Sequence, residues 1–435
     1  MNKDEVIEMT LPRLRAVYFT LIGLYWFSTA LVASLYVLFL MARGLDLATV
    51  GVWSGINALT VILLEIPTGG LADTWGRGRT FAAANIVTAL SLALMVAGPG
   101  TAVLFFGAAL FGAGRALSSG SLEAWFVDQV KLLAPERDIE AELGPAGAVM
   151  LLAVAAGSIL GSGLPGALRG MPLPRGWSTL AWPLVFDIAI KILTAVLAVI
   201  LVREPRRHGS PFRAIASALG EAPDLARTVR RTLTERRSLA LLFIGGAAIF
   251  LASGAVESFW QPRFRSLDPE KGFGIEFGVV MAAAYLAGAA VSLLAPRISR
   301  LLGGRRDRTA VLFALAASSG MLLLALAGGR GSTAAAMMLV YGAAEGCAVP
   351  RKAMLNDHIP ARARATMLSV DSLATYLGFA GVALLGFMAR SRGIPAVWVI
   401  AAGVVAATIW VYPRFIRVAR DESSGIIPEN REESA

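Results

Sequence analysis

Twelve long apolar stretches constrain this chain more than any other feature, because a helix that crosses a bilayer needs about 20 predominantly apolar residues. The stretches that we predict to span a membrane are residues 16–42, 46–72, 80–98, 102–130, 142–168, 179–202, 239–262, 273–296, 310–328, 333–357, 366–389 and 394–416. They are near-continuous apolar runs without the period-two alternation of membrane β-barrel strands. We therefore predict an all-α membrane protein with twelve transmembrane helices.

The composition supports this class over a soluble domain. Hydrophobic residues make up 56% of the chain, charged residues 16%, and the mean hydropathy is +0.66. Soluble domains are about 45–50% apolar and about 25% charged. Residues 1–10 are polar and lack the small-residue cleavage site of a signal peptide, so we expect a short cytoplasmic tail.

The charge pattern predicts the orientation. If the N-terminus is cytoplasmic, most of the 40 Lys and Arg fall in the two termini and in the loops on that same side. This is the positive-inside rule, so we expect both termini to be cytoplasmic. The net charge of +10 is spread over loops that flank the spans. It therefore indicates contact with anionic lipid head groups and not with nucleic acid.

An arginine-rich segment divides the chain into two halves. We predict an N-terminal six-helix bundle (1–202), a cytoplasmic basic linker (203–238), a C-terminal six-helix bundle (239–420) and a cytoplasmic tail (421–435). Apolar residues recur with helical spacing between 212 and 233, which predicts amphipathic helices on the membrane surface, with a disordered linker as the alternative. Similar glycine-flanked strings at 44–51 and 272–278 open the second and eighth spans, as expected for a parallel repeat.

The sharpest motif is E-I-P-T-G-G-L-A-D-T-W-G-R-G-R at residues 65–79, at the cytoplasmic end of the second span. It resembles the G-x-x-x-D-(R/K)-x-G-R-(R/K) signature of the major facilitator superfamily, in the E-x-P-T-G version of bacterial export permeases. The positions that match are Gly69, Asp73, Gly76 and Arg77. The sequence departs from the signature at Thr74 and Gly78, although Arg79 restores a charge.

Two further strings resemble the same permeases. Residues 112–128 contain Arg115 followed by S-G-x-x-E-A-W, and residues 364–369 read R-A-T-M-L-S. The resemblance implies two six-helix bundles that alternate access to a central site, in the cytoplasmic (inner) membrane of a bacterium. The fifth span has glycines at 157, 161 and 163 that permit close helix packing. It lacks the G-P-x-x-G-G signature of the antiporters in this family, which weakens an assignment of this chain as an antiporter.

The signature loop also predicts an inner gate. Glycines permit tight turns, and a carboxylate there can meet an arginine or a helix N-terminus. The resemblance implies that Asp73 meets the start of the eleventh span, near 365–366, and that Arg77 meets Asp128. The residues that we assign to the gate are Gly69, Asp73, Gly76, Arg77, Arg79, Asp128, Glu65 and Glu123. The alternative is a solvated loop that follows positive-inside statistics.

Charged side chains within apolar spans are costly and usually functional. We expect the following residues to line a substrate cavity: Tyr25, Asn57, Arg115, Glu257, Trp260, Glu345 and Tyr376. Glu257 and Glu345 are the candidates for proton coupling, since a low-dielectric cavity favours proton exchange by carboxylates. Asp187 and Lys191 are one helical turn apart, and we interpret them as a structural pair.

No enzyme signature is present. The chain has no Walker A loop, no nucleophile–base pair and no spacing of metal ligands, and the single Cys347 lies in an apolar span. We expect no cofactor, no metal and a functional monomer. The leading function is proton-coupled efflux of a small, partly hydrophobic compound. The alternatives are an importer or facilitator of a small metabolite and a non-transporting receptor or scaffold.

Overall fold

The computed structural model describes residues 9–204, 236–359 and 364–424, with a few single positions between 220 and 234. In these ranges every regular element is a helix. The amphipathic helices predicted between 212 and 233, and the tail beyond 424, lie outside the described residues. The chain divides into two compact units: unit 1 contains 1–220 and 261–286, and unit 2 contains 221–260 and 287–435.

The helices of the first half belong to unit 1. They are α1 (Leu11–Ala33), α2 (Tyr36–Ala42), α3 (Leu47–Trp75), α4 (Arg77–Ala97), α5 (Gly100–Ser118), α6 (Ser121–Leu133), α7 (Ile139–Ala167), the short 3-10 helix η1 (Thr179–Ala181) and α8 (Trp182–Leu201). Unit 1 also takes the end of α10 (Arg237–Ser266) and the beginning of α11 (Ile275–Leu301).

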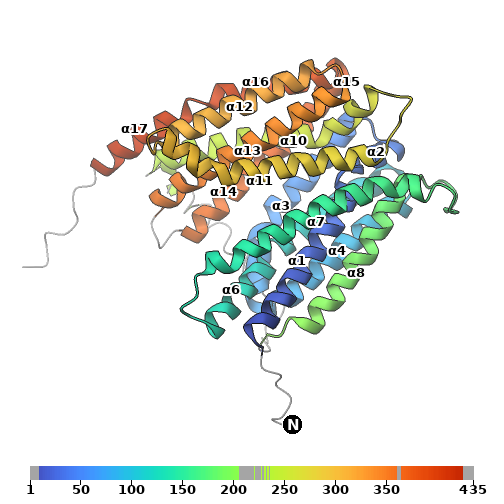
Figure 1. Ribbon diagram of the computed structural model, residues 1–435, viewed down its shortest axis with the longest axis horizontal. Coiled ribbons are helices and arrows are strands. Elements are labelled where there is room, and N and C mark those ends of the chain that lie inside the picture. Colours follow the sequence, from blue (N-terminus) through green and yellow to red (C-terminus); the bar gives the residue numbers. More distant parts are fainter. Residues whose placement is uncertain are drawn as a thin grey trace, which may run out of the picture. The chain divides into compact units, whose positions relative to one another are not determined.

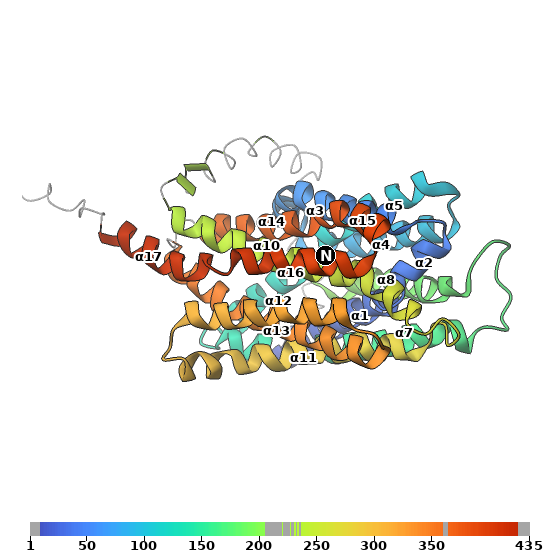
Figure 2. The ribbon, with the colours of Figure 1, turned by 90° about the horizontal axis from the view of Figure 1, so that it is seen from above.

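The remainder of α10 and α11 belongs to unit 2 together with the last six helices. These are α12 (Arg306–Leu326), α13 (Arg330–His358), α14 (Arg364–Ala380), α15 (Val382–Arg392), α16 (Ile394–Thr408) and α17 (Val411–Ser424). In this unit α12 packs along both α13 and α16, and Figure 2 shows α12 beside α13.

Twelve helical segments are long and apolar enough to cross a membrane, which confirms the predicted spans. Several are interrupted, which the sequence analysis did not predict. The first span breaks between α1 and α2 at residues 34–35. The fourth breaks between α5 and α6, where Gly120 has a φ of +67°, a backbone conformation that favours glycine. Arg115 therefore lies near the end of α5 and not in the middle of a continuous helix.

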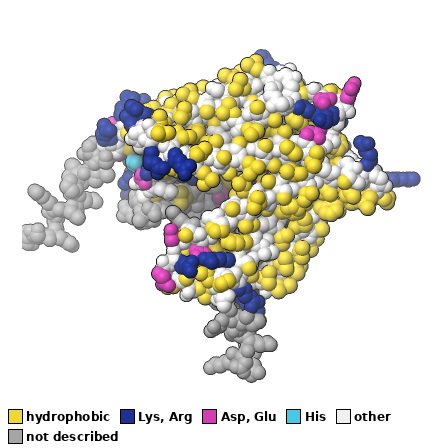
Figure 3. Space-filling model, in the orientation of Figure 1, with side chains coloured by type: hydrophobic (Ala, Val, Ile, Leu, Met, Phe, Trp, Pro, Cys, Tyr) yellow, Lys and Arg dark blue, Asp and Glu magenta, His cyan; other side chains and the backbone are white. Residues whose placement is uncertain are grey.

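Unit 1 is built around α1, which packs against α7 and α8 (Figure 1). In the same unit, α4 packs against α5 and α8. Close approach of α1 and α7 depends on Gly157 and Gly161, where an added Cβ would clash with the backbone carbonyls of Phe27 and Leu31. Gly163 has open space instead. Two of the three predicted packing glycines thus serve this contact. The sides of the helices are mostly hydrophobic, and charged side chains gather near their ends (Figure 3).

Candidate functional site

The predicted gate motif forms the turn between α3 and α4. Gly76 has a φ of +108°, so it permits the sharp turn after Trp75. The carboxylate of Glu204 accepts hydrogen bonds from the backbone N–H groups of Arg77 (3.1 Å) and Gly78 (3.2 Å). An anion at a helix N-terminus is favourable because the first N–H groups lack helical partners. Glu204 therefore fixes the start of α4, a role that the sequence analysis missed.

Arg77 joins two helices at this turn. Its guanidinium donates to Asp128 on α6 at 2.6 Å and lies 3.5 Å from Asp73 on α3. The pair of Arg77 and Asp128 that the resemblance implied is thus present. The carboxylates are exposed, with side-chain exposures of 51% for Asp128 and 66% for Asp73, so each contact contributes little stability. The predicted partner region at 365–366 lies outside the residues whose side chains are described.

The other predicted gate residues differ in exposure. Gly69, Arg79 and Glu123 are exposed, while Glu65 is half-buried on α3. Unit 2 repeats the arginine–aspartate pair: Arg306 at the start of α12 donates to Asp357 near the end of α13. Both pairs have the same sequence separation, 51 residues. Such a repeated pair supports the internal duplication, and the sequence analysis did not identify it.

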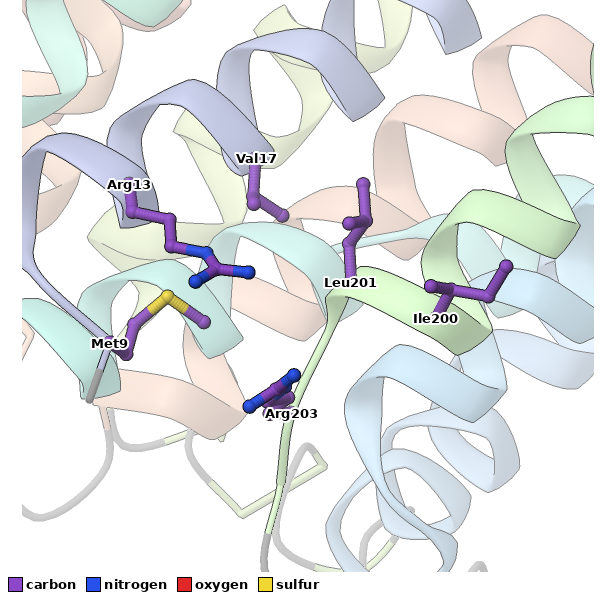
Figure 4. A pocket seen from close by; sticks show the side chains of 6 residues that line it. All are labelled: Met9, Arg13, Val17, Ile200, Leu201 and Arg203. Carbon is purple, nitrogen blue, oxygen red and sulfur yellow. The ribbon is translucent and has the colours of Figure 1, made fainter. Parts of the chain in front are cut away.

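A pocket lies beside the Arg306 pair. Its volume is about 460 Å³ and its lining includes Arg305, His358 and Arg420. In unit 1 a smaller pocket, of about 70 Å³, lies where α1 begins and α8 ends, between the side chains of Arg13 and Arg203 (Figure 4). Both pockets lie at helix ends on the side predicted to be cytoplasmic, and neither includes a predicted cavity residue.

Three predicted cavity residues belong to unit 1. Tyr25 on α1 and Ser118 on α5 form a hydroxyl–hydroxyl hydrogen bond of 2.8 Å, and the Ser118 hydroxyl donates to the Arg115 carbonyl at 2.9 Å. The Tyr25 hydroxyl is therefore the donor to Ser118. Ser118 thus links the Tyr25 hydroxyl to the backbone carbonyl of Arg115 at the break between α5 and α6. Asn57 on α3 is buried, and its Oδ1 makes no hydrogen bond to the described residues.

The other four predicted cavity residues lie in unit 2. Glu257 and Trp260 are on α10, where Glu257 is half-buried and Trp260 fully buried. Glu345 on α13 is exposed, and Tyr376 on α14 is half-buried. Gly288 on α11 leaves room for Glu345, since a Cβ there would approach its Cγ to 3.1 Å. Because these residues belong to a different unit from Tyr25, Asn57 and Arg115, the proposed cavity that they share stays a prediction.

The most buried ion pair of unit 2 escaped the sequence analysis. Arg351 on α13 donates through both terminal nitrogens to the two carboxylate oxygens of Asp371 on α14, the second at 3.1 Å. Gly246 on α10 makes room for the guanidinium, because a Cβ there would lie 2.8 Å from Nη1. The bidentate pair joins α13 to α14, and removing either partner would leave the other charge buried without its counter-charge.

The interpretation of Asp187 and Lys191 as a structural pair stays a prediction, because the two side chains share one face of α8 without forming a direct ion pair. Both side chains are only 1% exposed, in the middle of α8. The Lys191 ammonium donates to the Tyr25 carbonyl (3.1 Å) and to the Thr29 hydroxyl (2.7 Å) on α1, and forms no ion pair with Asp187. Spacing along one helix predicts a shared face, but it cannot predict that a neighbouring helix offers better acceptors.

The break between α1 and α2 is closed by a side chain from α10 within unit 1. Gln261, which is fully buried, donates through Nε2 to the Ala33 carbonyl (2.9 Å) and accepts the Val37 N–H through Oε1 (3.0 Å). In a continuous helix, the Val37 N–H would bond to the Ala33 carbonyl directly. The amide thus replaces one broken helical hydrogen bond with two. Nearby, Ser162 on α7 accepts from the Gly278 N–H at 3.1 Å.

A sequence model of the Major Facilitator Superfamily matches residues 18–351. No curated protein sequence matches the chain. The fold is similar to that of the nucleoside transporter NupG, with a TM-score of 0.72 and 12% identity over 93% of this chain and 99% of that one.

Two peptide transporter structures are similar as well. A POT family transporter in complex with a thioalcohol conjugated peptide has a TM-score of 0.65 and 13% identity, over 94% of this chain and 96% of that one. The peptide transporter POT in complex with sulfate has a TM-score of 0.67 and 14% identity, over 95% of each chain. At these identities the similarity establishes the fold alone.

Proposed function

We propose that this chain, which belongs to the major facilitator superfamily, moves a small, partly hydrophobic compound out of the cell in exchange for protons. Membership makes it a transporter and not an enzyme. The observation that carries the proposal is the set of ionisable groups inside apolar helices, including Arg115, Glu257 and Glu345. Such groups are costly in a membrane and mark ion or substrate pathways.

Efflux is favoured by the resemblance of residues 65–79 to export permeases. Uptake is the second candidate, because the structures with a similar fold are described as nucleoside and peptide transporters. The two directions are distinguished by expressing the protein in a bacterium that lacks its major efflux pumps. Efflux raises resistance to a panel of hydrophobic toxic compounds. Uptake increases sensitivity to toxic nucleosides or peptides, and that result would overturn the proposed direction.

Protons are the coupling ion in this proposal. Glu257 and Glu345 are the candidate carriers at the cavity, with Tyr25, Asn57, Arg115, Trp260 and Tyr376 as candidate substrate contacts. Once a substrate is found, its flux in proteoliposomes is measured with and without a pH gradient. If Glu257 or Glu345 carries the proton, its replacement by Gln abolishes the dependence of flux on the pH gradient. Substrate exchange across the membrane is preserved in that variant. Full gradient dependence in both single variants and in the double variant excludes these carriers.

The Asp73 turn acts as the inner gate. Arg77 is positioned between Asp73 and Asp128 at the turn, and such exposed contacts are weak enough to break in each cycle. Asp73→Asn shifts the protein toward the state that is open at this end, so a cysteine introduced there reacts faster with a thiol reagent. Asp138→Asn, at an exposed position, is the control. Equal labelling rates in both variants contradict the gate.

A further inference from the structure

The middle of α8 carries two buried ionisable side chains in unit 1 for which the proposed cavity has no use. Asp187 and Lys191 are each 1% exposed, and α8 packs against α1, α4 and α7. Burying a charge costs several kcal/mol unless hydrogen bonds or an opposite charge offset it. The cost is about as large in the apolar interior of a membrane-spanning bundle. A pair placed there needs a physical reason.

The ammonium group of Lys191 has a complete set of neutral acceptors. It donates to the Thr29 hydroxyl at 2.7 Å and to the Tyr25 carbonyl at 3.1 Å, and it lies 3.8 Å from the centre of the Tyr25 ring. A cation over an aromatic face is attracted by the quadrupole of the ring. This geometry holds a charged lysine without requiring a carboxylate as its partner.

Asp187 is the group that is left incompletely satisfied. Its Oδ1 is buried and makes no hydrogen bond to the described residues, although the Ser28 hydroxyl lies beside the carboxylate. Asp187 also makes no ion pair with Lys191. Binding a proton stabilises a buried carboxylate that has an unsatisfied oxygen, because the neutral acid costs less free energy to bury than the ion.

The charged neighbours of the pair are few. Asp187 and Lys191 are the two charged side chains of α8. From α1 the titratable neighbour is Tyr25. The buried polar side chains of α4 are uncharged, and Glu142 of α7 is held by Arg15 at 2.5 Å. Protonation of Asp187 would therefore change the local net charge from zero to plus one.

That change can be transmitted to the predicted substrate cavity. Lys191 contacts the ring of Tyr25, and the hydroxyl of the same ring donates to Ser118, whose own hydroxyl reaches the Arg115 carbonyl. These contacts connect α8 through α1 to the break between α5 and α6. A displacement of Lys191 relative to Tyr25 would alter the hydrogen bond at the break.

We propose that Asp187 is a buried proton-binding site of unit 1, and that Lys191 is a positioning residue that couples its protonation to Tyr25. A proton from water adds to a carboxylate oxygen of Asp187 and later returns to water, while Lys191 stays protonated throughout. The inference rests on the proposed proton coupling and adds a second site to Glu257 and Glu345.

The test measures proton binding directly and needs no substrate. Purified full-length protein is titrated with acid, and infrared difference spectra record the C=O band of protonated carboxyl groups. We expect one band component to disappear in Asp187→Asn and to remain in Asp138→Asn, which removes an exposed carboxyl group. Identical titrations of the two variants would overturn the proposal.

A second variant tests the role of Lys191 and guards against misfolding of Asp187→Asn. In Lys191→Met the Asp187 band should persist, and its midpoint should move to higher pH by about one unit, because an opposite charge that favours the carboxylate is lost. An unchanged midpoint contradicts the coupling. If the Asp187 band titrates as expected but transport is independent of a pH gradient, the proposed function fails while the proton site stands.

Discussion

Replacement of Gln261 by Met gives the sharpest test of the break between α1 and α2. Met has a similar length but cannot bond to the Ala33 carbonyl or the Val37 N–H, so two hydrogen bonds are lost and two buried backbone groups are left unsatisfied. An orphaned buried group costs about 1–3 kcal/mol. Hydrogen bonds within membrane proteins average about 0.6 kcal/mol, because the unfolded chain finds other partners there. Two such groups would cost about 2–6 kcal/mol, and we expect a loss of about 2 kcal/mol, at the low end of that range.

The measurement can use the chain's own reporter. Cys347 is the single cysteine and is buried, so a dye that fluoresces on reacting with thiols reports thermal unfolding. Gln261→Met should lower the apparent Tm by several degrees. Gln129→Met is the matched control, since Gln129 on α6 makes no hydrogen bond to the described residues through its side chain. Equal Tm values for the two variants would refute the argument that the amide repairs the break.

Two further predictions use internal controls. Asp371→Asn should lower the free energy of unfolding by about 3 kcal/mol, because it leaves the Arg351 guanidinium buried without its counter-charge. The double apolar variant Arg351→Met/Asp371→Leu should lose much less stability. Thermal unfolding in which the double variant is the less stable of the two contradicts this prediction. Gly161→Leu should abolish stable expression, because the side chain would clash with the backbone of α1. Gly163→Leu, at a position with open space, should be purified in normal yield. Equal yields of the two variants would be inconsistent with the packing described.

The membrane spans were predictable because each is a long run of apolar residues. About 20 apolar residues satisfy the bilayer whatever the neighbouring helices do, so the twelve segments agree with the structure to within a few residues at most ends. The breaks were not predictable in the same way. A helix break at residues 34–35 shows no proline or glycine in the sequence. It depends on Gln261, which is distant in the chain and offers an amide to the broken backbone.

The candidate site was predictable only where a motif is local. The glycines of residues 65–79 indicate a turn. The contact of Arg77 with Asp128 is the one that the family pattern implies. Glu204 and Arg351 carry no such signal, because each acts on a helix that is remote in sequence. The break at Gly120 did have a signal, since the string S-S-G-S at 118–121 is a run of helix-weakening residues. The same residues belong to the family-like string around Arg115, which by itself does not indicate a turn.

Two buried polar side chains of unit 1 bond to the backbone of α1, a helix whose sequence is largely apolar. Its backbone carbonyls accept hydrogen bonds from Lys191 at Tyr25 and from Gln261 at Ala33. Backbone groups carry no sequence signal, so hydropathy cannot reveal this role. Because α8 and α10 both bond to α1, a rotation of α1 would break contacts at both places at once. Protonation at Asp187 and repair of the break by Gln261 should therefore be coupled, and in a double-variant cycle of Asp187→Asn and Gln261→Met the two stability losses should fail to add.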